Sequence, residues 1–181
     1  LDHIEYHPAY HALMHQSSEA GLHVSTWQAD GGDGDLRHRL RAARFYMTAQ
    51  TECGHLCPLT MTHAAPAALA HGEGLGEALG GLNFRRGYDP SFRPLGEKAS
   101  ITVGMGITEK QGGTDVRANT THAERIEGTT YRITGHKWFL SAPMSDAFVI
   151  LAGTDAGPTA FLVPRVLPDG NTNPIRLPRL K

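Results

Sequence analysis

The order of two hydrophobic patterns constrains this chain more than any other feature. Apolar residues recur at helical spacing within the first 70 residues, whereas short β-type runs begin only after residue 99. Between them, residues 71–98 contain many glycines together with Pro90 and Pro94, which is typical of a linker or irregular turns. Helices followed by strands predict segregated layers or two domains, not alternating βαβ units. We therefore expect an α+β fold, with a helical part and linker over residues 1–98 and a β-domain over residues 99–181.

Three segments carry helical periodicity. The first starts at His7-Pro8, because proline suits the first helical position, and runs toward Trp27. The second begins at Asp35 and carries two stripes, which predict an amphipathic helix that packs its apolar face on the core. The apolar stripe comprises Leu36, Leu40, Ala43 and Met47, and the basic stripe comprises Arg37, Arg41 and Arg44. The third covers residues 59–70. Strands are expected over residues 101–105, 130–133, 147–152 and 159–163.

Composition excludes several classes of protein. The 181 residues are 40% hydrophobic and 19% charged, with a net charge of −1. No run approaches the roughly 18 apolar residues of a membrane-spanning helix, and the balanced charge gives no whole-chain attraction for nucleic acid. Leu1 stands where a start methionine would be, and residues 175–181 still resemble a strand. We expect a cytoplasmic protein without membrane contact, of which this chain is one piece.

Two histidine and cysteine patterns raise the question of a metal. Cys53 and Cys57 have no second cysteine pair, so buried, reduced thiols are favoured over zinc. Histidines recur every four residues at positions 3, 7, 11 and 15. Pro8 breaks that series, because a helix that begins there keeps only His11 and His15 on one face. We predict no metal site.

The arginine stripe has two interpretations. Three arginines on one helix face could meet phosphate groups. A solvated face, or contacts with acidic neighbours, is the simpler explanation of the same pattern.

Two loops carry the residues best suited to ligand chemistry. Residues 104–116 leave a strand and expose hydroxyls and backbone N–H groups, which suit an anion or the polar edge of a planar cofactor. Gly112-Gly113 is equally compatible with a hairpin turn. Neither a phosphate-binding P-loop spacing nor a GxGxxG motif before a helix is present. Residues 135–143 place Trp138 and Phe139 near Ser141, which could wall a flat ligand or simply pack a strand.

Together, these stretches resemble the acyl-CoA dehydrogenase family. The match rests on Thr108-Glu109, on Gly112 to Asp115, and on Gly135, Lys137 and Phe139 to Ser141, in that order and spacing. Residues 105–116, 6–11 and 56–62 look like its AidB-type branch, the adaptive-response proteins linked to DNA alkylation. The resemblance covers nearly the whole chain and is weakest over residues 71–98. It implies a truncated form of the family's plan, with an antiparallel, β-barrel-like middle domain and no C-terminal helical domain.

Carried over residue by residue, the resemblance implies an FAD site. Residues 105–108 would run beside the isoalloxazine ring, Thr114 would contact the pyrophosphate, and residues 139–141 would close the other side. The cofactor-binding residues implied are Met105, Gly106, Ile107, Thr108, Thr114, Phe139, Leu140 and Ser141. Two departures from the family pattern are Phe139, where tryptophan is usual, and Lys110-Gln111, which replaces Pro-Gly. The second could change substrate access near the flavin.

The implied activity is oxidation of a CH–CH bond in an acyl-CoA thioester by an oxidoreductase that forms homo-oligomers. The alternative is a DNA-associated protective flavoprotein with vestigial dehydrogenase activity. In the family, the catalytic base is a glutamate of the missing C-terminal domain, so no catalytic residue is assigned and the chain alone should be inactive. DNA contact in this branch is also attributed mainly to that region. We expect Glu109 to cap a helix or to pair with Lys110 or Arg117.

Overall fold

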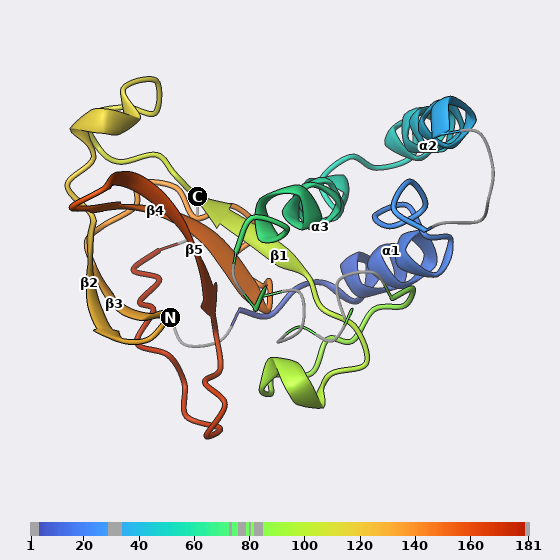
Figure 1. The fold of residues 1–181 in the computed structure, drawn as a ribbon. Helices are drawn as coiled ribbons and strands as arrows, with labels where there is room; N and C mark the ends of the chain where they lie inside the picture. The colour runs from blue at the N-terminus through green and yellow to red at the C-terminus, as the bar shows by residue number, and fades with distance from the viewer. Residues whose placement is uncertain are drawn as a thin grey trace.

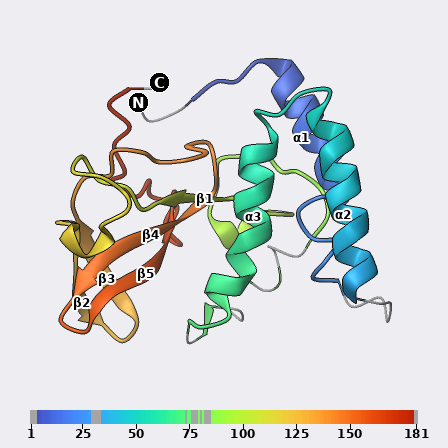
Figure 2. The ribbon, with the colours of Figure 1, turned by 90° about the horizontal axis from the view of Figure 1, so that it is seen from above.

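Helices and strands occupy opposite sides of the molecule. The computed structural model describes residues 4–28, 34–72, 74, 75, 79, 81 and 85–179. Figure 1 shows three helices on one side and a curved sheet on the other. Figure 2 shows α3 (Leu56–Leu69) between the sheet and the pair formed by α1 (Pro8–Glu19) and α2 (Gly34–Ala49). The predicted α+β organisation is confirmed. Within the described part of the chain, no helix is long and apolar enough to cross a membrane.

The first helix is shorter than its periodicity predicts. Pro8 stands at its start, and the His7 Nδ1 accepts a hydrogen bond from the Ala9 N–H at 3.1 Å. The helix ends at Glu19 instead of continuing toward Trp27, because Gly21 adopts a positive φ of 73° and residues 20–27 form turns. Helix α3 begins at Leu56, three residues before the predicted start.

The second helix is placed as predicted but turned the opposite way. Three of its apolar residues are more than half exposed, at 52% for Leu36, 54% for Leu40 and 61% for Met47. The arginine stripe instead faces the turns after α1. Arg37, Arg41 and Arg44 donate to the carbonyl oxygens of Gln28, Leu22 and Ala20, at 2.6, 2.8 and 2.5 Å. The side of α2 that faces the rest of the molecule therefore carries guanidinium groups, where the pattern predicts apolar side chains.

A five-stranded sheet forms the second layer. Its strands are β1 (Val103–Gly106), β2 (His122–Glu127), β3 (Thr130–Thr134), β4 (Ala147–Thr154) and β5 (Gly157–Pro164). Strand β4 pairs antiparallel with β5 along one edge and parallel with β1 along the other, where it also meets β2 at Gly153. Strand β2 pairs antiparallel with β3.

Three sheet predictions need correction. The predicted middle domain is antiparallel and barrel-like, whereas the observed sheet is open and mixed, because the long crossover between β1 and β4 permits parallel pairing. Strand β2 is absent from the prediction because its polar residues HAERIE are exposed at five of six positions. The last described residues, 175–179, form no strand, and residues 180 and 181 lie outside the described part.

Two apolar clusters hold the layers together. One joins α3 to the sheet through Ala65, Leu69, Ile101, Val103 and Val149. The other joins α1 to the start of α3 through Met14, Leu22, Leu56 and Leu59. The buried Thr62 hydroxyl also accepts a hydrogen bond from the Val103 N–H at 3.0 Å, which fixes α3 on β1. This packing leaves Cys53 and Cys57 on the outward side, so both thiols are exposed and not buried as predicted.

Candidate functional site

The two predicted ligand loops lie side by side. Met105 and Ser141 form an antiparallel bridge, with N–O distances of 3.3 Å and 2.8 Å between their backbones. Three residues further along, the Trp138 N–H donates to the Thr108 carbonyl at 2.9 Å. This register places residues 105–108 against residues 138–141. The structure therefore brings together seven of the eight predicted site residues, although they come from loops more than 30 positions apart.

Close backbone approach explains the glycines of this region. A Cβ added at Gly104 would lie 2.5 Å from the Ser141 carbonyl oxygen and 2.7 Å from the Phe148 ring. One added at Gly113 would lie 2.7 Å from the Thr108 hydroxyl, so the later part of the same loop folds back onto Thr108. Thr114, the eighth predicted residue, follows directly and is exposed. The hairpin interpretation of Gly112 also holds, because its N–H bonds to the Glu109 carbonyl at 3.0 Å.

Among the eight residues, only Gly106 is buried. Phe139 is 44% exposed, and the adjacent Trp138 is 39% exposed. The predicted residues include three with hydroxyl groups, Thr108, Thr114 and Ser141. They also include the apolar residues Met105, Ile107 and Leu140. A surface of this kind combines hydrogen-bonding groups for a polar edge with apolar groups for a flat ring.

A buried carboxylate fastens the two loops. Glu109 Oε1 accepts from Lys137 Nζ at 2.8 Å and from the Thr121 N–H at 2.9 Å. Its Oε2 accepts from the Thr120 N–H at 2.7 Å and the Thr120 hydroxyl at 2.9 Å. Burial opposes ionisation of this side chain, but the hydrogen bonds from Lys137, Thr121 and Thr120 outweigh it and hold the Glu109 pKa below its ordinary value.

The partner predicted for Glu109 is wrong. Lys110 and Arg117 are closer along the chain, but both are exposed, whereas Lys137 is folded against the carboxylate 28 residues away. The sequence contains no local signal for this pair, because the contact depends on the register between the two loops. The pairing of Glu109 with Lys137 is therefore the feature of this region that sequence reasoning missed.

The histidine series and the arginine stripe contain side chains that hydrogen-bond within the protein. The His11 Nδ1 lies 2.9 Å from the Tyr88 hydroxyl, and His3 lies outside the described residues. In the part of the chain that the structure describes, no three histidine, cysteine or acidic side chains are grouped as a metal site would require. The arginine stripe binds carbonyl groups, as described above, in place of the acidic neighbours expected.

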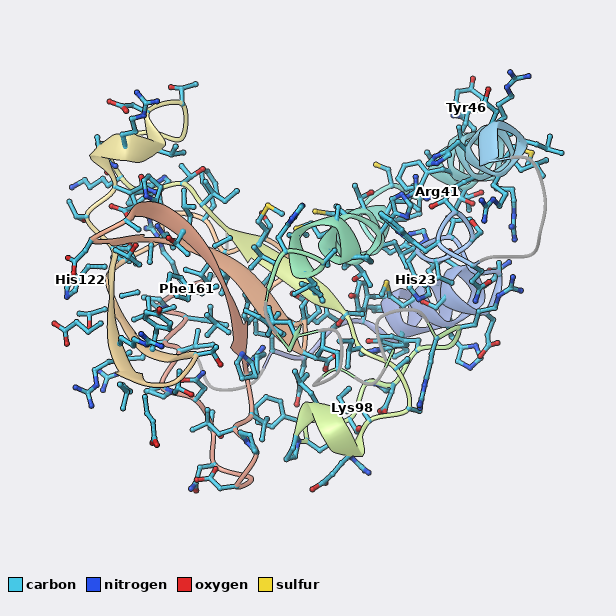
Figure 3. All side chains as sticks on the ribbon, in the orientation of Figure 1. His23, Arg41, Tyr46, Lys98, His122 and Phe161 are labelled. Carbon is cyan, nitrogen blue, oxygen red and sulfur yellow. The ribbon has the colours of Figure 1, made fainter. Side chains whose placement is uncertain are left out.

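A large cavity lies against strands β3, β4 and β5 of the sheet. It measures about 1520 Å³ and includes Tyr131, Phe148, Ile150 and Phe161 in its walls. Figure 3 shows Phe161 on this part of the sheet, away from the helices. Of the eight predicted residues, Phe139 and Leu140 border this cavity, whereas the three hydroxyl residues do not. The hydroxyl-bearing surface and the cavity are therefore different features.

Comparisons with known proteins match both halves of the chain. The family model for the adaptive response protein AidB N-terminal domain matches residues 1–90, and the model for the acyl-CoA dehydrogenase middle domain matches residues 104–177. The putative acyl-CoA dehydrogenase AidB of Escherichia coli is 47% identical over 186 residues, a match that covers 100% of this chain and 33% of that protein.

A second relative is known from sequence and structure. Acyl-CoA dehydrogenase family member 11 of Caenorhabditis elegans is 30% identical over 95% of this chain and 29% of its own length. The crystal structure of Caenorhabditis elegans ACDH-11 in complex with C11-CoA superposes with a TM-score of 0.81 at 28% identity, covering 100% of this chain and 32% of that one. The chain thus spans about a third of the length of these relatives. The two family models match successive parts of the chain, and the relatives match it along nearly its whole length. The chain therefore belongs to the acyl-CoA dehydrogenase family, with a first half of the AidB type.

Proposed function

We propose that this chain is the part of an AidB-type flavoprotein that holds one side of FAD, in an oxidoreductase acting on the CH–CH bond of an acyl thioester. The observation that carries the proposal is the pairing of residues 105–108 with residues 138–141, which brings partly exposed hydroxyl and apolar residues of the two loops together. Family membership supports a flavin as the ligand. The donor set also fits one, because three hydroxyls suit the polar edge and phosphates, and an exposed phenylalanine suits the ring.

Each residue has a distinct part in holding the cofactor. Thr108 and Ser141 would offer hydroxyl groups to its polar edge, and Thr114 would offer one to the pyrophosphate. Met105, Ile107, Phe139 and Leu140 would exclude water from the ring face, and Gly106 would let the backbone approach it. When bound, FAD supplies a hydride acceptor for oxidation of the substrate.

The base is not among the residues of this surface. Glu109 is the nearest carboxylate along the chain, but four hydrogen-bond donors hold it ionised against the effect of burial and occupy both of its oxygens. A proton-abstracting group must reach the substrate carbon, so we propose that it comes from outside this chain. Acyl-CoA is proposed as substrate, because a family member of the same fold is known in complex with C11-CoA. A homo-oligomeric, cytoplasmic protein remains our expectation.

The test is FAD binding by the full-length protein. The double substitution T108A/S141A removes two hydroxyls and is expected to raise the dissociation constant for FAD about thirtyfold, at roughly 1 kcal/mol for each lost hydrogen bond. Fluorescence titration of the apoprotein measures it. The matched control T130A/T134A removes two exposed hydroxyls of β3 and should leave the affinity unchanged. Equal FAD affinity in wild type and T108A/S141A would refute the assigned surface.

A second function is supported by the match of residues 1–90 to the adaptive response protein AidB N-terminal domain, because the sequence resembles a branch linked to DNA alkylation. In that alternative, the protein protects DNA and its dehydrogenase activity is vestigial. Addition of acyl-CoA to the yellow full-length protein separates the two. Bleaching of the visible flavin band supports dehydrogenation, whereas an FAD-loaded protein whose band stays unbleached supports the protective role.

A further inference from the structure

We propose that the Glu109–Lys137 ion pair is the positioning device of the flavin surface, setting how closely residues 105–108 and 138–141 approach. This inference rests on the proposed function. The pair occupies the positions next to that surface, since Glu109 follows Thr108 and Lys137 precedes Trp138. Its members join the two loops beside the hydrogen bond from the Trp138 N–H to the Thr108 carbonyl.

The carboxylate of Glu109 joins a third segment as well. The N–H groups of Thr120 and Thr121, just before β2, donate to it, and the Thr121 carbonyl in turn accepts from the Gly153 N–H of β4 at 2.8 Å. The Asn119 side chain donates to the Ile107 carbonyl at 3.0 Å, which adds a second link from this segment to the first loop. One side chain therefore holds both flavin loops to the central strand.

Burial makes the pair intolerant of small changes. The side chains of Glu109 and Lys137 are only 3% and 8% exposed. A glutamine at position 109 would carry an NH₂ group among N–H, O–H and ammonium donors, and would leave the Lys137 charge without a counter-ion. Removal of Lys137 alone is milder, because Glu109 keeps three donors from Thr120 and Thr121.

The test compares FAD dissociation constants of the full-length apoprotein variants E109Q, K137M and E109Q/K137M. We expect about tenfold weaker binding for E109Q and about threefold for K137M. The double variant should bind FAD less than about thirtyfold more weakly, which is the product of the two single effects. The amide at position 109 no longer faces an unpaired ammonium in that variant. The visible absorption band of bound FAD should also shift in E109Q at saturating FAD.

The control is E124Q, which makes the same change in an exposed glutamate of β2, 66% exposed and 3.9 Å from His122. Its FAD affinity should stay within twofold of wild type. An E109Q protein with a lower melting temperature but wild-type FAD affinity and spectrum would overturn the positioning role. Multiplicative effects in the double variant would also overturn it. Failure of the wild-type protein to bind FAD would instead refute the proposed function.

Discussion

Gly104 illustrates how single residues set the geometry of the candidate site. It lies in β1 with its Cα facing the Phe148 ring, and the Ser141 carbonyl passes beside it. Because Gly104 has no side chain, the backbone of β1 can approach residues 138–141 closely enough to form hydrogen bonds. The bridge between Met105 and Ser141 depends on that approach. One missing methyl group thus permits the pairing of two distant loops.

We predict that G104A destabilises the protein by about 2 kcal/mol, because the added methyl group overlaps backbone and a buried ring. The control is G153A in β4, where an added Cβ would lie 3.6 Å from the nearest atom, the Thr121 carbonyl oxygen. Urea-induced unfolding of the 181-residue chain measures both. A G104A variant no less stable than G153A would show that the sheet adjusts freely at this point.

Helix α2 shows that an amphipathic pattern does not by itself decide which face is buried. The residues after α1 end in turns whose carbonyl groups point toward α2, and guanidinium groups satisfy them. Arg41 also lies over the Phe45 ring at 5.2 Å. In Figure 3, Arg41 lies on the side of α2 that faces the rest of the molecule, and Tyr46 projects from the opposite side. Hydrogen bonds from arginines to these carbonyl groups therefore decide the orientation of α2, and burial of its apolar stripe does not.

The two stripes should respond oppositely to substitution. R41M removes a charged hydrogen bond to the Leu22 carbonyl and should destabilise the 181-residue chain by about 1.5 kcal/mol. L40E places a charge on a side chain that is already 54% exposed and should change stability by less than about 0.5 kcal/mol. Thermal unfolding measures both changes. A larger loss for L40E than for R41M would mean that the apolar face is the packed one.

At the scale of the whole molecule, Lys98 ties the segment before the sheet to the start of β4. Its ammonium pairs with the Asp146 carboxylate at 2.8 Å and donates to the Asp89 and Ser91 carbonyls at 2.8 and 2.5 Å. The Asp146 carboxylate also accepts from the Thr102 N–H at 2.7 Å, just before β1. Residues 85–98, the described end of the predicted linker 71–98, are thereby held against the start of β4 by buried charge.

Stability should decrease in acid through Asp89. Burial opposes its ionisation, but hydrogen bonds from Ser91 and the Ala99 N–H, with the Lys98 charge, lower its pKa from 3.8 to about 2. A lowered folded-state pKa gives stability that is present above about pH 4 and lost as the pH falls toward 2. D89N should therefore lower the free energy of unfolding by about 2 kcal/mol at pH 7 and by progressively less below pH 4.

The measurement is the melting temperature of wild type and D89N from pH 7 to pH 2. Asp169 offers a control, because its carboxylate is bonded only within the exposed turn of residues 169–171. D169N should show a smaller difference from wild type throughout this range. A constant gap between wild type and D89N at every pH would remove Asp89 as the source of the acid sensitivity.

The resemblance to a known family named the residues of the candidate surface, and that assignment stays a prediction. The sequence by itself determined the order of layers, three helices and four of the five strands. These depend on local periodicity, turn residues and motif spacing, all of which act over a few neighbouring positions. Only the tertiary structure decided the parallel pairing of β1 with β4, the outward turn of the α2 apolar face and the choice of Lys137 as the partner of Glu109. Each depends on the register between segments distant in the chain, where the satisfaction of buried carbonyls and charges outweighs local pattern.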